Sequence, residues 1–264
     1  MTTTRHTEFE RTLCDAYQNV GAFNADILYI YSDLRHFGLY AAGYKDKQDF
    51  CQAIASPLLG QGKTIVIATF TYTVDGRYDV LSTPTKIGVM NKWILAQPES
   101  SRSEHPLFSY AALGPNAALV ENIGKSAFGH DSIYDRLLNK RAAFLHIGRP
   151  VSLGNTALHH VEQMCGATYR MHKAFRTEVF KGDNYVGTDY SAFLRRRDVA
   201  GQDFEFDFVE AAEKLQHKNL ISQVGSEHDL SNISFYWYDQ ALDYLHDMFY
   251  ENQHIFIGSD FMEY

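Results

Sequence analysis

The sequence has few of the features that several large protein classes need. Its three cysteines, Cys14, Cys51 and Cys165, are odd in number and scattered, which indicates neither a disulfide framework nor a cysteine-based metal or redox motif. Acidic residues outnumber basic ones, 32 to 24, so the net charge is −8 and we expect no nucleic-acid partner. No apolar run approaches the ~20 residues that span a bilayer, and residues 1–20 are too charged for a secretory signal. These absences predict a soluble, cytoplasmic protein with no membrane partner.

The sequence also lacks the short motifs of several enzyme classes. Residues 62–64 (Gly-Lys-Thr) lack the earlier glycine of a phosphate-binding loop, and they precede a predicted strand rather than follow one. Residues 124–128 lack the second glycine of a hydrolase nucleophile elbow. His159, His160 and Glu162 do not provide two histidines four residues apart, as zinc peptidases do, so we predict no metal site.

Alternating apolar patterns predict an α/β fold. Residues 25–31 and 64–70 are apolar runs typical of buried strands, and residues 47–59 between them have helical spacing, which together predict a parallel strand pair. We interpret residues 1–264 as one domain, because no repeat, low-complexity tract or Pro/Gly/Ser-rich linker divides them. The other predicted elements are helices at 8–19, 87–97, 156–165, 204–215 and 237–250, and strands at 142–147, 185–190 and 254–257.

The segment 102–114 contains a candidate general base. His105 directly precedes Pro106, whose ring restricts the backbone that carries the imidazole. An unperturbed histidine titrates near neutral pH, which suits proton transfer. A hydrogen-bonded structural histidine is the alternative, and the local sequence does not decide between the two.

A set of motifs in a particular order connects this segment to a known family. Over about residues 25–175 the chain resembles aminoglycoside 3-N-acetyltransferases. Three positions depart from the family pattern: Asp33, Lys92 and Ile133 stand where serine, an acidic residue and proline are frequent. Residues 176–264 resemble the family least. The motifs are Tyr31-Ser32-Asp33-Leu34, Thr69-Phe70-Thr71-Tyr72, Thr83-Pro84-Thr85, Gly88, Arg102-Ser103-Glu104-His105-Pro106, Ser109, Gly114-Pro115-Asn116-Ala117, residues 132–137, Gly148 and residues 155–162.

The resemblance implies a three-layer α/β/α sandwich of the aminoglycoside 3-N-acetyltransferase type, distinct from other acetyltransferase folds. It implies a coenzyme A-binding core in residues 25–175, with acetyl-CoA or another short acyl-CoA as donor, and a C-terminal region, 176–264, that contributes to the acceptor site. Backbone N–H groups of the loop 32–38 could bind a pyrophosphate, whereas turn formation and helix capping are the alternative there. The implied coenzyme-binding residues are Ser32, Asp33, Leu34, Arg35, His36, Phe37, Gly38, Thr69, Phe70, Thr71, Arg102, Ser103 and Ser109.

The mechanism implied is direct transfer to an amine in a ternary complex. His105 would remove the amine proton, and Glu162 would orient the base or hold the acceptor ammonium. A covalent route through Cys51 or Cys165 is the alternative. The implied substrate-binding residues are Tyr72, Asn155, Thr156, His159 and Glu162.

Three functions are compatible with this chemistry, and in each the partner is a small molecule. We favour a nucleotide-linked amino deoxysugar for O-antigen or capsule synthesis, because the aromatic C-terminal region departs most from the resistance enzymes. Aminoglycoside acetylation, and hence antibiotic resistance, is the second, favoured by the acidic residues Asp203, Glu205, Asp207, Glu210 and Glu213. The third is a catalytically silent coenzyme A-binding protein. The acyl chain, the acylated position and the choice between monomer and homodimer stay open. The aromatic residues of the C-terminal region that favour the nucleotide-linked sugar are Phe235, Tyr236, Trp237, Tyr238, Tyr244, Phe249 and Tyr250.

Overall fold

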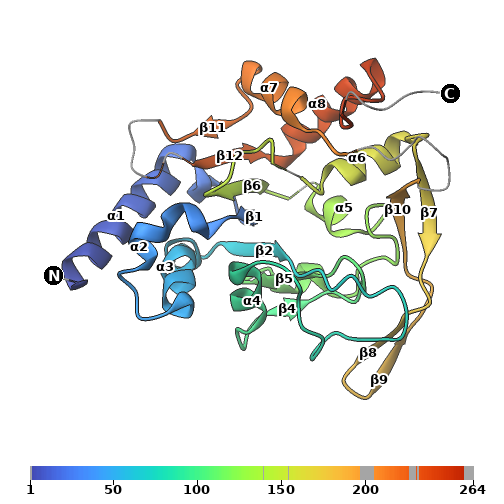
Figure 1. The fold of residues 1–264 in the computed structure, drawn as a ribbon, viewed down its shortest axis with the longest axis horizontal. Helices are drawn as coiled ribbons and strands as arrows, with labels where there is room; N and C mark the ends of the chain where they lie inside the picture. The colour runs from blue at the N-terminus through green and yellow to red at the C-terminus, as the bar shows by residue number, and fades with distance from the viewer. Residues whose placement is uncertain are drawn as a thin grey trace.

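A seven-stranded mixed sheet forms the centre of the protein (Figure 1). The computed structural model describes residues 2–138, 140–153, 155–196, 205–225, 230 and 232–258. The strand order is β11–β12–β6–β1–β2–β5–β4, in which β6, β1 and β2 are parallel and every other pairing is antiparallel. The predicted parallel pair is therefore confirmed at the centre of a sheet with antiparallel margins. The strands are β1 (Ile27–Ser32), β2 (Thr64–Ala68), β4 (Ser101–Arg102), β5 (Tyr110–Leu113), β6 (Ala142–Ile147), β11 (Ser222–Gln223) and β12 (Ile233–Trp237).

Helices cover both faces of this sheet, which confirms the three-layer α/β/α architecture. On one face α1, α3 and α4 pack through side chains such as Phe9, Phe50 and Trp93. On the other face α5, α6, α7 and α8 enclose a second core that contains Tyr134 and Phe249. None of the described helices is long and apolar enough to cross a membrane. The α-helices are α1 (Thr2–Val20), α2 (Gly38–Ala41), α3 (Lys47–Gly60), α4 (Val89–Leu95), α5 (Ile133–Leu137), α6 (Leu158–Cys165), α7 (Val209–His217) and α8 (Tyr238–Glu251), and the 3₁₀ helices are η1 (Ala22–Asn24), η2 (Leu34–Phe37) and η3 (Ala117–Val120).

The central strands are apolar throughout because both of their faces are buried. In β1, Tyr29 and Tyr31 point into the core beneath α5 and α6, whereas Leu28 and Ile30 point into the core beneath α1 and α3. A parallel strand covered on both sides has no polar face, so it reads as a continuous apolar run. This explains why β1, β2 and β6 agree closely with the predicted strands.

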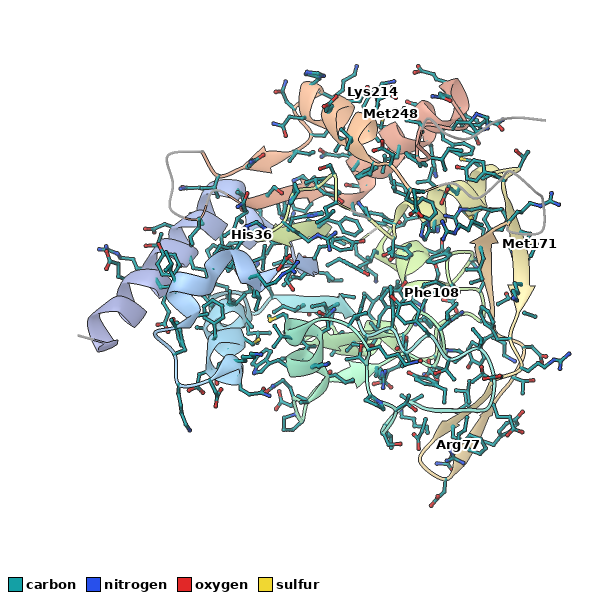
Figure 2. All side chains as sticks on the ribbon, in the orientation of Figure 1. His36, Arg77, Phe108, Met171, Lys214 and Met248 are labelled. Carbon is teal, nitrogen blue, oxygen red and sulfur yellow. The ribbon has the colours of Figure 1, made fainter. Side chains whose placement is uncertain are left out.

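Two small sheets extend from the second face, and the sequence did not predict most of their strands. They are formed by β7 (Arg170–Ala174) with β10 (Ser191–Arg195), and by β3 (Arg77–Asp79), β8 (Glu178–Lys181) and β9 (Asn184–Gly187). The three-stranded sheet projects from the body, with Arg77 at its far end (Figure 2). Four of the five residues of β7 are exposed, so the strand lacks the apolar pattern that would reveal it.

The C-terminal predictions were partly right. α8 confirms the predicted helix at 237–250, and α7 starts at Val209, later than predicted; residues 203 and 204 lie outside the described residues. The strand predicted at 254–257 is wrong except for one bridge between Phe206 and Ile257. Because β12 lies beside β6, the C-terminal region is part of the same sheet as the N-terminal one. One domain stays a prediction, which this shared sheet favours.

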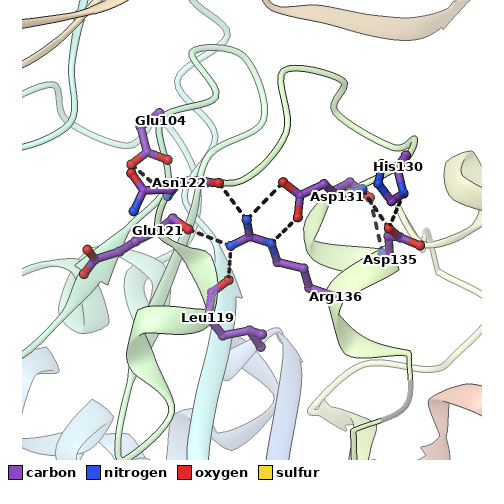
Figure 3. A network of polar contacts seen from close by, with 9 residues as sticks. Glu104, Leu119, Glu121, Asn122, His130, Asp131, Asp135 and Arg136 are labelled. Carbon is purple, nitrogen blue, oxygen red and sulfur yellow. Dashed lines mark hydrogen bonds and ion pairs between the residues drawn. The ribbon is translucent and has the colours of Figure 1, made fainter.

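Arg136 attaches α5 to the preceding loop (Figure 3). Its guanidinium donates to the carbonyls of Leu119, Glu121 and Asn122 at 2.6–3.0 Å and pairs with the Asp131 carboxylate at 2.6 and 3.1 Å. Bidentate pairing of this kind fixes orientation as well as distance. The short helix α5 therefore has a defined position, and so does its residue Tyr134, whose hydroxyl contacts Thr156.

Candidate active site

A cavity of about 390 Å³, called here the central cavity, lies at the carboxyl ends of the parallel strands. Open α/β sheets place their ligands at this edge. β1 contributes Tyr31 and Ser32, the segment after β2 contributes Phe70 and Tyr72, and the segment after β6 contributes Arg149. The cavity is also lined by Asn155, Thr156, His159, Phe206 and Phe208.

A second cavity of about 670 Å³, called the outer cavity, adjoins the first. The two have Ser32, Gly88 and Arg149 in common, so they meet at these residues. The outer cavity has apolar walls, and Arg35, Lys47 and Arg149 supply positive charge.

Five of the seven residues predicted in the loop 32–38 line the outer cavity: Ser32, Asp33, Leu34, Arg35 and Gly38. Of the remaining two, His36 is exposed and Phe37 is buried against Phe9 on α1. The Asp33 carboxylate accepts a hydrogen bond from the Arg35 backbone N–H, and the Arg35 side chain pairs with it at 2.5 Å.

This pairing lowers the pKa of Asp33 to about 2. The start of η2 is thus already occupied by the chain's own carboxylate, as the capping alternative proposed. The backbone of this loop has less capacity for a pyrophosphate than predicted.

His105 does not line either cavity. The imidazole is completely buried, its Nδ1 accepts hydrogen bonds from the backbone N–H groups of Leu107 and Phe108 at 3.3 and 3.1 Å, and Nε2 lies 3.0 Å from the Ser191 carbonyl. Burial lowers the pKa of His105 to about 4. With both ring nitrogens occupied by backbone, His105 has no lone pair for an amine. The geometry therefore corrects the hypothesis of His105 as the base and gives it the structural role.

The other residues of the 102–109 segment are also structural. Arg102 is buried and donates to the carbonyls of Thr69 and Thr83 at 3.1 and 2.5 Å, so it is not available for a coenzyme phosphate. Ser103 Oγ accepts from the Tyr110 N–H, and Ser109 Oγ donates to the Thr69 carbonyl. Figure 2 labels His36 and Phe108, one in each of these two predicted coenzyme segments. Residues of the loop 32–38 line the outer cavity, whereas none of the residues 102–109 lines either cavity.

Two further predicted coenzyme residues lie in the strand-to-loop segment after β2. Thr69 and Thr71 are buried, and the Thr71 hydroxyl donates to the Pro106 carbonyl. Of the predicted residues 69–71, Phe70 alone lines the central cavity. Tyr72 also lines it, is 47 % exposed, and has a φ of 55°, an uncommon value for a tyrosine. Its role in acceptor binding stays a prediction.

His159, unlike His105, lines a cavity and pairs with a carboxylate. It lines the central cavity near the start of α6, and its Nδ1 lies 2.8 Å from Glu162 Oε2, one helical turn later. Within the described part of the chain, its Nε2 has no hydrogen-bond partner. Glu162 is completely buried, and Arg170 on β7 pairs with the same Oε2 at 2.8 Å.

Electrostatics favour one charge state for this group. Glu162 is ionised, because Arg170 and His159 lower its pKa against the opposing effect of burial. Burial and the nearby Arg170 lower the pKa of His159, so the imidazole is neutral at pH 7. When the neutral imidazole donates Nδ1–H to Glu162, its lone pair is on Nε2, which is the form that a general base needs. The Arg170 terminal nitrogen, 2.9 Å from the same Nδ1, would donate to it in the opposite tautomer, so the ionised Glu162 and Arg170 compete for Nδ1.

A chain of hydrogen-bonded side chains connects the wall of the central cavity, at Tyr31, Asn155 and Thr156, with the buried core. Tyr110 donates to Tyr134, Tyr134 contacts Thr156 at 2.5 Å, Thr156 contacts Tyr31 at 3.2 Å, and Tyr31 donates to Asn155 Oδ1 at 2.8 Å. Asn155 Nδ2 then donates to the Tyr236 hydroxyl on β12 at 2.6 Å. The predicted acceptor residues Asn155, Thr156 and His159 are therefore brought together, and Glu162 lies behind them.

The comparisons with known proteins agree with this architecture. The family model described as aminoglycoside 3-N-acetyltransferase matches residues 32–241. The chain belongs to this family. A curated relative, aminoglycoside N(3)-acetyltransferase IX of Micromonospora chalcea, is 25 % identical over 150 residues, which are 54 % of this chain and 51 % of the relative. The chain thus spans about half the length of that aminoglycoside 3-N-acetyltransferase.

Solved structures with the same fold include two aminoglycoside acetyltransferases of the AAC(3) type and one further bacterial protein. The apoenzyme of AAC(3)-IVa superposes with a TM-score of 0.71 at 18 % identity, covering 94 % of this chain and 90 % of that one. AAC(3)-IIb gives 0.70 at 17 % identity, with 92 % and 97 % covered. The YokD protein of Bacillus subtilis gives 0.68 at 15 % identity, with 92 % and 99 % covered.

Three site residues were not predicted from the sequence. Arg149 lines both cavities, Arg170 pairs with Glu162, and Phe206 packs against His159 with ring centroids 4.8 Å apart. Arg149 directly follows β6 and Gly148, a position at the ligand-binding edge that the strand prediction could have identified. Arg170 and Phe206 are 8 and 44 residues after Glu162, too far for a local motif to reveal.

Proposed function

We propose that this chain is an acyl-CoA-dependent N-acyltransferase that acetylates an amino group of an aminoglycoside. The observation that carries the proposal is the His159–Glu162 pair on the wall of the central cavity, in a chain of this family. His159, rather than His105, is the proposed general base.

The outer cavity suits the coenzyme. Its apolar walls can receive an adenine or pantetheine, and Lys47 and Arg149 can bind phosphates, whereas Arg35 is paired with Asp33. Since the two cavities meet at Ser32, Gly88 and Arg149, a donor held in the outer cavity can reach the central one. When bound, acetyl-CoA supplies an acyl thioester.

The protein's own groups then carry the proton. His159 Nε2 accepts a proton from the amine as its nitrogen forms a bond to the thioester carbonyl carbon, and it can return that proton to the sulfur when the carbon–sulfur bond breaks. Glu162 holds the Nδ1–H tautomer and stabilises the charged imidazole. A covalent route is disfavoured, because burial raises the pKa of Cys51 to about 11 and also raises that of Cys165.

The acceptor is assigned from the relatives. Solved structures of family members contain a gentamicin or apramycin on AAC(3)-IVa and sisomicin on AAC-VIa. These favour an aminoglycoside over the nucleotide-linked sugar preferred from the sequence. The acidic residues first invoked do not carry the argument: Glu205 is exposed, Glu210 pairs with Lys214 on α7, and Asp203 lies outside the described residues.

One observation favours the nucleotide-linked amino sugar as a second candidate. Arg149 lines the central cavity, and no acidic side chain lines that cavity within the described part of the chain. A wall with an arginine and no carboxylate suits a phosphate-bearing acceptor better than it suits a polycationic one. The aromatic residues 235–250 do not line the described wall, although Tyr236 accepts a hydrogen bond from Asn155, which does.

A free-thiol release assay tests the proposal. It combines acetyl-, propionyl- and hydroxybutyryl-CoA with an aminoglycoside panel and with nucleotide-linked amino sugars. We expect turnover of aminoglycosides with acetyl-CoA; turnover of nucleotide-linked sugars alone would establish the second candidate. Tight coenzyme A binding without turnover of any amine would indicate a silent binding protein.

The base is tested by substitution. We expect His159→Ala to lower kcat by about 10²-fold or more, the contribution typical of a general base. His172→Ala on the exposed strand β7 is the matched control and should keep full activity. Full turnover by His159→Ala, with its fold intact, would refute the assignment.

A further inference from the structure

Arg170 contacts both members of the His159–Glu162 pair from a different element of the fold. Its Nε lies 2.8 Å from Glu162 Oε2, and one terminal nitrogen lies 2.9 Å from His159 Nδ1. The other terminal nitrogen donates to the Phe193 carbonyl on β10 at 2.8 Å. The guanidinium carbon also lies 4.7 Å from the centre of the Phe206 ring. Strand, helix and ring thus hold the guanidinium in one place.

We propose that Arg170 is a positioning residue that keeps the pair in its base-competent form, with Glu162 ionised and His159 neutral. This inference rests on the proposed function, because it takes His159 as the base. In this role Arg170 determines whether the His159–Glu162 pair takes up a proton, and it does not contact the acceptor or the coenzyme.

The argument starts from the cost of a buried charge. Glu162 is completely buried, and a carboxylate in such a position becomes protonated unless a cation compensates it. The Arg170 guanidinium, 2.8 Å from Glu162 Oε2, supplies that cation. His159 therefore does not need to be protonated to balance Glu162.

The same cation acts directly on the imidazole. With the guanidinium 2.9 Å from Nδ1, a second positive charge on His159 is unfavourable. The lowered pKa values of both His159 and Glu162 have the signs that this arrangement requires. Without Arg170, the pair would take up one proton at a higher pH and would lose the lone pair on Nε2.

The other titratable groups around the pair do not replace Arg170. Tyr169 lies beside Glu162, and its pKa is raised by burial and by that carboxylate, so it stays neutral. Cys165 follows on α6 with a raised pKa. On β10, Arg195 is the register partner of Arg170, and its charge faces Glu205, 3.9 Å away. His160 points elsewhere, with Nδ1 2.6 Å from the Phe128 carbonyl.

The test compares Arg170→Gln with Arg170→Lys and with Arg195→Gln, which removes a charge from the neighbouring strand. We expect Arg170→Gln to lower kcat/KM on the acid limb of the pH profile by about tenfold or more. The rate should recover as the pH rises, because the acid limb of the profile moves upward by about one unit or more. Arg170→Lys should restore part of that shift, and the KM for acetyl-CoA and the Arg195→Gln profile should stay unchanged.

Nuclear magnetic resonance of ¹⁵N-labelled histidine measures the protonation state of His159 in the absence of substrate. The His159→Gln variant assigns the signal. We expect neutral His159 with Nδ1–H in the native free protein and a proton gained by the pair in Arg170→Gln. An equal loss of rate at every pH, with His159 unchanged in the spectrum, would overturn the inference and leave the proposed function standing. Full activity of His159→Ala would instead overturn the proposed function, whatever the spectrum shows.

Loss of folding is controlled by a double variant. Glu162→Gln combined with Arg170→Gln removes both charges, so no unpaired charge stays buried. We expect this variant to fold and to have an acid limb closer to that of the native protein than Arg170→Gln alone. An acid limb displaced as far as in Arg170→Gln would contradict the charge-balance argument.

Discussion

Replacement of His105 by alanine separates a structural histidine from a catalytic one. His105 is completely buried and serves three backbone groups: the Leu107 and Phe108 N–H groups and the Ser191 carbonyl. A buried backbone group left without a partner costs ~1–3 kcal/mol. With at least two groups affected and a small cavity added, we expect His105→Ala to lower the free energy of unfolding by about 3–5 kcal/mol. For a protein of this size that corresponds to a Tm lower by roughly 10 °C.

The loss should depend on pH in a defined direction. The pKa of His105 is about 4 when folded, below the ~6.5 of an unfolded chain. Because the unfolded chain takes up the proton first as pH falls from ~6.5 to about 4, the native protein loses about 3 kcal/mol of stability to this group over that interval. His105→Ala lacks the group, so the stability difference from the native protein should become smaller by that amount.

Urea unfolding at about pH 7 and about pH 4.5, on either side of most of this interval, measures the change directly. His172→Ala is the control that changes neither value. Turnover per folded molecule, measured well below the Tm, should fall less than about threefold in His105→Ala, whereas loss of a general base costs about 10²-fold or more. A loss of kcat of that larger size at undiminished stability would refute the structural role and restore His105 as the base.

Two further predictions concern the place where β6 ends. Gly148→Ala should lower the free energy of unfolding by about 2–4 kcal/mol in denaturant titration, because φ is 72° and a Cβ there would lie 2.3 Å from the Asp33 carbonyl oxygen; an unchanged midpoint would show that this close approach is not real. Arg149→Gln should raise the KM of a phosphate-bearing acceptor about tenfold or more and leave that of an aminoglycoside within about threefold, in steady-state assays. Equal effects on both acceptors, together with weaker coenzyme A binding, would place Arg149 on the coenzyme instead.

The sequence predicted the parts of the fold whose burial is two-sided. β1, β2 and β6 are apolar throughout because helices cover both faces, and α3 is bounded by an Asp46 cap, which accepts from the N–H groups of Gln48 and Asp49, at its start. β7 and β9 are largely exposed, so their residues carry no such pattern. The family resemblance identified the segment 155–162, which ends in α6, for the same reason that it identified 102–109: both contain family motifs.

The resemblance could not decide which histidine acts. His105 and His159 both belong to motifs, and only the packing shows that the first has both nitrogens bound to backbone whereas the second keeps Nε2 for the cavity. Similarly, Arg102 and Arg170 are both buried, and the difference is whether carbonyl oxygens or a carboxylate surround the guanidinium. Such differences arise from contacts across the fold, which local sequence does not contain.

The position of Tyr236 has a consequence for how the protein is made. Asn155 obtains one of its partners from β12, which pairs with β6 across roughly 90 residues of intervening chain. During synthesis, β6 therefore leaves the ribosome with an unpaired edge, and Asn155 in the cavity wall lacks its Tyr236 partner until residues 233–237 have followed. A nascent chain stopped before residue 233 should already hold the parallel centre of the sheet, yet it should bind ligands poorly. The last strand to join the sheet is thus the one that completes the site.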